Sequence, residues 1–280
     1  MYHDDAALSW LCSIVLLTVA VAYVSGAVVV CRRGGWWPAE RTACWIAGLL
    51  AAAAALAGPL AAAAHHDFRA HMAGHLLLGM AAPLLLVLAA PVTLAMRALP
   101  VALARSLAHL LATAPVRTIT HPATAAVLNA GGLWLLYTTG LYRAMTEHPW
   151  AHLAVQAHIV AAGYLFTAGI IGVDPARHRP RPPTRAIALI AFLAAHAILA
   201  KYLYGHPPAG VRPGDGRAGA ELMYYGGDLI DLVLIAVLCR QWYHAADPRP
   251  RTRPAAPGIR NVRPRWRLPD EMRRRHDPVN

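Results

Sequence analysis

Seven long apolar stretches constrain this chain more than any other feature. They are residues 8–31, 43–64, 72–96, 122–142, 149–173, 186–204 and 222–239. A helix needs roughly 20 mostly apolar residues to cross the hydrocarbon core of a bilayer, and each stretch is close to that length or longer. With 57% hydrophobic and 14% charged residues, the chain also lacks the polar surface of a soluble domain. The sequence therefore predicts an all-α, polytopic transmembrane helical bundle of about seven spans within residues 1–243.

Arginine content alternates between the loops that join these stretches. Arginines concentrate after the first, third, fifth and seventh stretch, whereas the loops near 65–69, 143–148 and 207–221 have fewer arginines and carry acidic residues. Cytoplasmic loops of membrane proteins are enriched in Lys and Arg. We therefore expect the N-terminus outside, the C-terminus in the cytoplasm and a multi-pass protein of the cell membrane. The formal net charge of +12 follows from this topology, so we do not expect nucleic-acid binding.

Two segments outside the predicted spans have compositions of their own. Residues 244–280 combine Arg with Pro and show no apolar periodicity, which is typical of a disordered tail. On the cytoplasmic side, the positive charge of this tail would contact anionic lipid. In residues 101–114, Arg105 and His109 lie one turn apart among Leu and Ala, which predicts a helix on the inner membrane surface.

Ionisable side chains at the outer ends of the predicted spans mark a candidate site, because such residues are costly in a bilayer and indicate function by default. They are His71, His75, His158, His196, Asp228 and Asp231. Imidazole binds Zn, Cu, Fe and Ni alike, and the thioether of Met72 would favour Cu(I). The sequence thus predicts a metal-competent site facing outside, in which Asp228 is a ligand or orients a histidine. We interpret His65, His66, His148 and His206 as interfacial residues.

The same residues occur within longer motifs. These are His71-Met72-x-x-His75, Ala82-Pro83-Leu84-Leu85, Pro91-Val92-Thr93-Leu94, His158 with Gly163-Tyr164-Leu165-Phe166, Gly172-Val173-Asp174-Pro175, His196 and Gly227-Asp228. This pattern resembles the CtaG-type assembly factors of bacterial caa-type cytochrome c oxidases, a family of polytopic membrane proteins. The resemblance implies a role in making an active oxidase through copper supply at the outer face, with oxidase subunits as partners. The implied metal ligands are His71, Met72, His75, His158, His196 and Asp228.

Two other functions are compatible with a layer of membrane histidines. An intramembrane zinc-dependent hydrolase would use three protein ligands and an activated water. A b-type haem membrane protein would place histidines from facing helices on the iron. The sequence shows no nucleophile paired with a base, no phosphate loop and no dinucleotide fingerprint, so we expect an assembly factor rather than an enzyme.

Overall fold

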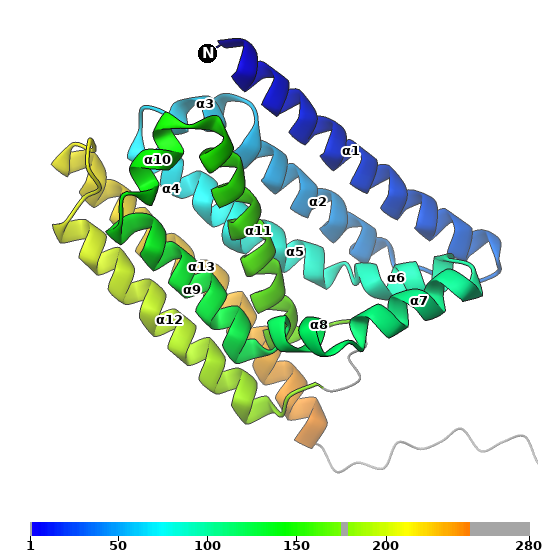
Figure 1. Ribbon diagram of the computed structural model, residues 1–280. Helices are drawn as coiled ribbons and strands as arrows, with labels where there is room; N and C mark the ends of the chain where they lie inside the picture. Colours follow the sequence, from blue (N-terminus) through cyan, green and yellow to red (C-terminus); the bar gives the residue numbers. More distant parts are fainter. Residues whose placement is uncertain (1, 175–178, 247–280) are drawn as a thin grey trace, which may run out of the picture. The chain divides into compact units, whose positions relative to one another are not determined.

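The computed structural model in Figure 1 describes residues 2–174 and 179–246. Within these residues the chain forms helices and contains no strand, so the predicted all-α membrane bundle is confirmed. Most of the segment predicted as a tail, residues 244–280, lies outside the described residues. Residues 244–246 are the last residues of a long helix, α13.

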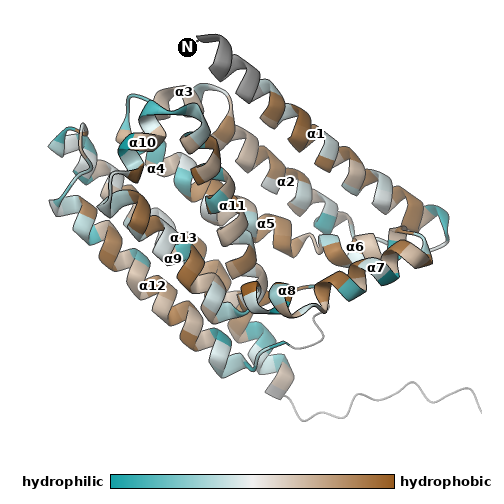
Figure 2. Cartoon of the chain, viewed as in Figure 1, coloured by the Kyte–Doolittle hydropathy of each residue, from teal (hydrophilic) through white to brown (hydrophobic). Residues whose placement is uncertain are grey.

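Six helical segments in the described chain are long and apolar enough to cross a membrane. They belong to α1 (Tyr2–Arg32), α2 (Ala39–Leu56), the unit Phe68–Leu88, α11 (Pro149–Ile171), α12 (Pro182–Gly205) and α13 (Pro213–Ala246). The span predicted at 122–142 corresponds to α9 (Pro122–Thr138), whose 17 residues fall at the short end of the lengths that span a bilayer. Figure 2 shows apolar residues along α1, α5 and α12. The chain is a multi-pass membrane protein.

The stretch predicted as one span at 43–64 is two helices. α2 ends at Leu56, and α3 (Pro59–Ala64) begins after a break at Gly58, which has φ +87°. A proline fits the first turn of a helix, and the residue before it is pushed away from helical geometry. The part of this stretch long enough to cross the membrane is therefore α2, which begins at Ala39, before the predicted start.

The stretch predicted at 72–96 is also interrupted. It comprises α4 (Phe68–Leu76), a π-helical turn η1 (Leu77–Ala81), α5 (Ala82–Leu88) and α6 (Pro91–Ala98). The chain leaves the helix at Ala90, which has the left-handed φ of +53°, so Pro91 starts a new helix instead of lying within the span. In η1 the Ala82 N–H bonds to the Leu77 carbonyl, five residues back. Such π turns frequently occur at functional sites.

The unit α4–η1–α5 lies at the centre of the packing. α5 and η1 contact both α2 and α11, while α9 packs on α11 and α12, and α1 packs on α2 and α6 (Figure 1). α7 (Val101–Leu111) occupies most of the segment predicted as an interfacial helix, and Val101, Leu103 and Leu110 are exposed on it. The short helices α8 (Ala114–Ile119) and α10 (Leu141–Glu147) complete the described chain.

Asp174 joins the end of α11 to the start of α6. α11 ends at Ile171, where the Gly172-Val173-Asp174 turn begins. The Asp174 carboxylate accepts hydrogen bonds from the backbone N–H groups of Val92 (3.2 Å) and Thr93 (2.7 Å) and from the Thr93 hydroxyl (2.6 Å). These N–H groups have no partner within the helix, so the carboxylate caps α6.

Replacing Asp174 with alanine should therefore lower the free energy of unfolding by about 1–2 kcal/mol. Thermal unfolding of the detergent-purified protein measures this loss. Asp215→Ala is the matched control, because Asp215 pairs with Arg212 at the surface, where an ion pair contributes about 1 kcal/mol or less. Equal stability of the two variants would contradict the capping role.

Candidate functional site

Of the described residues that carry buried polar atoms without a hydrogen-bond partner, three are histidine or aspartate side chains of α4, α12 and α13. The atoms are Nδ1 and Nε2 of His75, Nε2 of His196 and Oδ1 of Asp231. Their side chains are 6%, 4% and 2% exposed, respectively. Leaving one buried polar group unpaired costs about 1–3 kcal/mol, so such groups require an explanation. We call these three residues the buried polar group.

Two imidazole rings face each other in this group. The ring centroids of His75 on α4 and His196 on α12 are 6.2 Å apart, with 24° between the ring planes. His196 also stacks on Phe192 at 5.8 Å, one turn earlier on α12. A neutral imidazole offers one nitrogen lone pair, so the pair presents two donor atoms to a small guest.

Glycines let neighbouring helices approach these rings. A Cβ at Gly227 of α13 would lie 2.7 Å from Cε1 of His196, so only glycine fits there without displacing the ring. Asp231 follows one turn later on α13 and therefore shares the helix face of Gly227. On the other side, a Cβ at Gly79 of η1 would lie 3.6 Å from Nδ1 of His75.

His71 and Met72 lie one turn nearer the start of α4 and contact a tyrosine. Nε2 of His71 is 3.0 Å from the Tyr137 hydroxyl, which donates to the Met72 sulfur at 3.7 Å. The rings of Phe68 and Tyr142 pack against His71 at 5.7 and 5.4 Å. Met72 has no exposed surface. Tyr137 lies at the end of the apolar helix α9, and its contacts with His71 and Met72 were not predicted from the sequence.

Further histidines connect this region to the end of the bundle where the loops predicted to lie outside are located. His65 stacks on His152 with ring centroids 5.8 Å apart, and His152 is 2.7 Å from the Gln156 amide. His71 lies within electrostatic reach of both of these histidines and of His75. We call His65, His152, His71, His75 and His196 the imidazole row.

The remaining two predicted site residues lie elsewhere. His158 is exposed on α11, with Nε2 at 3.2 Å from the Leu128 carbonyl, and it packs over Gly132 of α9. Asp228 is exposed, whereas Asp231, three residues later, is buried. Of the predicted set, the structure brings His75 and His196 together, places His71 and Met72 beside Tyr137, and leaves His158 and Asp228 apart from them.

The number and type of ligand atoms decide which ions the His75–His196 pair can bind. No cluster of three or more His, Cys, Asp or Glu side chains able to hold a metal ion occurs among the described residues. A catalytic zinc site takes three protein ligands and a structural site takes four. Imidazole and thioether groups suit copper. The facing imidazoles of His75 and His196 therefore supply fewer protein ligands than either kind of zinc site requires.

The sequence model of the cytochrome c oxidase caa3 assembly factor family matches residues 21–245, which include all the helices that carry these side chains. The chain belongs to this family. It is also similar to uncharacterized proteins of Mycobacterium bovis and Mycobacterium tuberculosis, each 35% identical over 188 residues. An uncharacterized protein of Mycobacterium leprae is 28% identical over 188 residues.

These relatives are much longer than this chain. The matched region covers 65% of the chain and only 28% of each mycobacterial protein. No solved structure matches the chain at a significant level. Membership of the assembly factor family therefore rests on the match over residues 21–245.

Proposed function

We propose that the protein assists assembly of a caa3-type cytochrome c oxidase by holding copper(I) transiently and passing it to oxidase subunits at the outer face. The central observation behind this proposal is the buried His75–His196 pair, whose ring centroids lie 6.2 Å apart and which has three nitrogens without a hydrogen-bond partner. Copper is cargo in this scheme, and the imidazole row is the route between the outer loops and the pair.

Charge balance supports a monovalent ion at this position. Two neutral imidazoles do not compensate a positive charge, and an isolated charge inside a membrane is costly. Asp231 lies one turn after Gly227, the α13 residue that adjoins His196, and its Oδ1 has no partner in the described chain. Its carboxylate would balance the charge of one Cu(I), whereas a divalent ion would leave one positive charge uncompensated.

Copper(I) titration of the detergent-purified protein against a competing chelator tests the proposal. We expect binding to be lost in His75→Ala and in His196→Ala. His206→Ala is the matched control, because His206 is exposed at the end of α12 and stacks on Tyr202 at 4.7 Å. Unchanged copper affinity in all three variants would exclude the copper route and leave family membership intact.

The same preparation distinguishes the two alternative functions. Zinc retained through purification, together with hydrolysis of a peptide substrate, would favour an intramembrane hydrolase. A haem absorption band that disappears in His75→Ala would favour a b-type haem protein. Either result would replace the copper proposal.

Replacing Asp231 with asparagine should lower copper(I) affinity about 10–100-fold, the range seen when a group supporting a metal ligand is removed. Asparagine keeps the size of the side chain and removes its charge. Asp228→Asn is the control, because Asp228 is exposed three residues earlier on the same helix. Competition titrations of both variants measure the difference, and a larger loss in Asp228→Asn would assign the acid to the exposed position.

A further inference from the structure

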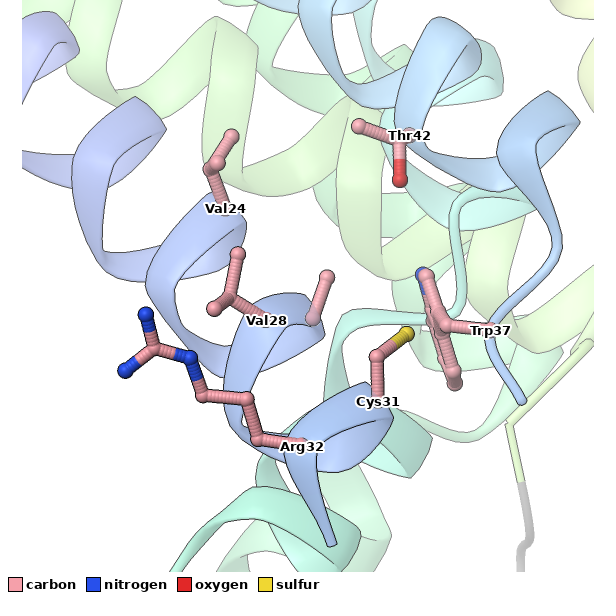
Figure 3. Close-up of a pocket in the computed structure, with 7 residues that line it drawn as sticks. Val24, Val28, Cys31, Arg32, Trp37 and Thr42 are labelled. Carbon is pink, nitrogen blue, oxygen red and sulfur yellow. The ribbon is translucent and has the colours of Figure 1, made fainter. Parts of the chain in front are cut away.

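A groove lies between α1 and α2 (Figure 3), and none of its lining residues belongs to the imidazole row. Its volume is about 530 Å³. The lining residues are Val24, Ala27, Val28, Cys31, Arg32, Trp37 and Thr42. Figure 3 shows the Cys31 sulfur directed toward the Trp37 ring across the groove. One end is thus apolar, and the other carries a guanidinium and an indole.

Four arginines gather at this end of α1, α2 and α6. The guanidinium carbons of Arg41 and Arg97 lie 5.1 and 5.7 Å from the centroid of the Trp37 ring. Arg33 donates to the Ala98 carbonyl at 3.0 Å, and Arg32 lines the groove itself. The ion pairs in the described chain, Arg143–Glu147 and Arg212–Asp215, belong to other loops. Among the described residues, none of these four arginines forms an ion pair, so together they make a positively charged patch.

The wall that carries this patch is fixed by packing. The Trp37 indole donates to the Tyr23 hydroxyl at 3.3 Å, and that hydroxyl donates to the Ala89 carbonyl at 2.8 Å. Tyr23 stacks on Trp45 with centroids 4.5 Å apart. Trp37 is 6% exposed, so the position of its indole is set before any ligand arrives. A preformed site loses less entropy on binding.

From the groove and its charge, we propose that this site binds one anionic phospholipid of the cytoplasmic leaflet. An acyl chain would lie along Val24, Ala27 and Val28, and the phosphate would meet Arg32 and Arg41. Arginine forms bidentate hydrogen bonds to phosphate, and anionic lipids of the cytoplasmic leaflet attract basic residues near the membrane. Tryptophan is favoured at the same interfacial depth.

The occupant must be both anionic and long-chained, because the groove combines the two surfaces. A soluble anion would use the arginines and leave the apolar walls against bulk lipid. An acidic peptide would need polar partners along the groove, where the described lining offers only Thr42 and Cys31 beside Arg32 and Trp37. An anionic phospholipid satisfies both ends at once.

Native mass spectrometry of the full chain tests the site. The protein is released from micelles that contain equal amounts of phosphatidylglycerol and phosphatidylcholine with identical acyl chains. We expect one retained phosphatidylglycerol. Arg32→Gln and Arg41→Gln should each lower its retention about fivefold. Arg105→Gln, which removes one exposed charge from α7, should leave retention unchanged.

A second variant tests the contribution of the apolar groove separately from that of the arginine charges. Ala27→Phe keeps all four arginines and fills the apolar end, so the bound phosphatidylglycerol should be lost while thermal stability is retained. Equal retention of the two lipids by the unmodified protein would overturn the proposal. Two other results would make the site a simple anion site and would also overturn the proposal. One is phosphatidylglycerol retention that Ala27→Phe does not change. The other is a rise in thermal stability with glycerol phosphate equal to that with phosphatidylglycerol.

Discussion

Replacing His75 with leucine should abolish assembly of active caa3-type oxidase while making the protein itself more stable. Both ring nitrogens of His75 are buried and unpartnered, so leucine removes no hydrogen bond and relieves the penalty of two unpaired polar atoms. Replacing a buried unsatisfied group by an apolar group of similar shape is stabilising by about 1–3 kcal/mol. A residue kept at such a penalty is expected to serve function.

Oxidase activity per unit of membrane protein, with the amount of the variant measured by immunoblot, provides the functional readout. Thermal unfolding of the purified variant provides the second readout, the stability of the protein. His206→Leu controls for the loss of one histidine, since that side chain is exposed. Full oxidase activity in His75→Leu would contradict the proposed function, and a fall in stability would show that the ring has a partner in the folded protein.

The opposite change in stability is expected for His71, which lies one turn before His75 on α4. His71→Leu breaks the 3.0 Å contact between His71 and the Tyr137 hydroxyl, so it should destabilise the protein by about 1–2 kcal/mol. The same chemical change on one helix therefore separates a partnered histidine from an unpartnered one. Thermal unfolding of the two leucine variants measures whether each substitution raises or lowers stability. A more stable His71→Leu variant would contradict the Tyr137 contact.

The membrane spans were predictable because length and hydropathy alone determine them. The apolar stretches at 149–173 and 186–204 appear as α11 and α12 with nearby boundaries. The interruptions were harder to place, although Pro59 and Pro91 each begin a helix in the structure. The residue that turns the chain before Pro91 is Ala90, and no propensity favours a left-handed alanine.

Which residues line the site depends on how each helix is rotated about its axis. The position of a residue in the sequence gives its depth in the membrane but not this rotation. Asp228 and Asp231 are three residues apart and lie close in angle on a helix, so depth alone did not separate them. The contact of Gly227 with His196 fixes the rotation of α13, and it places Asp231 inside and Asp228 outside. His158 has a suitable depth, yet α11 turns it toward α9.

The close approach of α11 to η1 depends on a pair of glycines. A Cβ at Gly163 would overlap the Gly79 carbonyl oxygen and would lie 3.1 Å from Cγ of Pro83. The Gly79 carbonyl is available there because Pro83, four residues later, has no N–H to bond it. Backbone atoms form this contact, so no flexible side chain can move aside to make room.

Gly163→Ala should therefore destabilise the protein by about 3 kcal/mol, the upper part of the range for an overpacked core. The added methyl group would push α11 away from η1, whose Gly79 lies beside the His75 ring, so copper(I) affinity should fall together with stability. Gly131→Ala is the matched control, since a Cβ there meets nothing within 4 Å and alanine favours the helix. Thermal unfolding of the two variants measures the contrast. Equal stability would mean that α11 and η1 do not approach as closely as the two glycines allow.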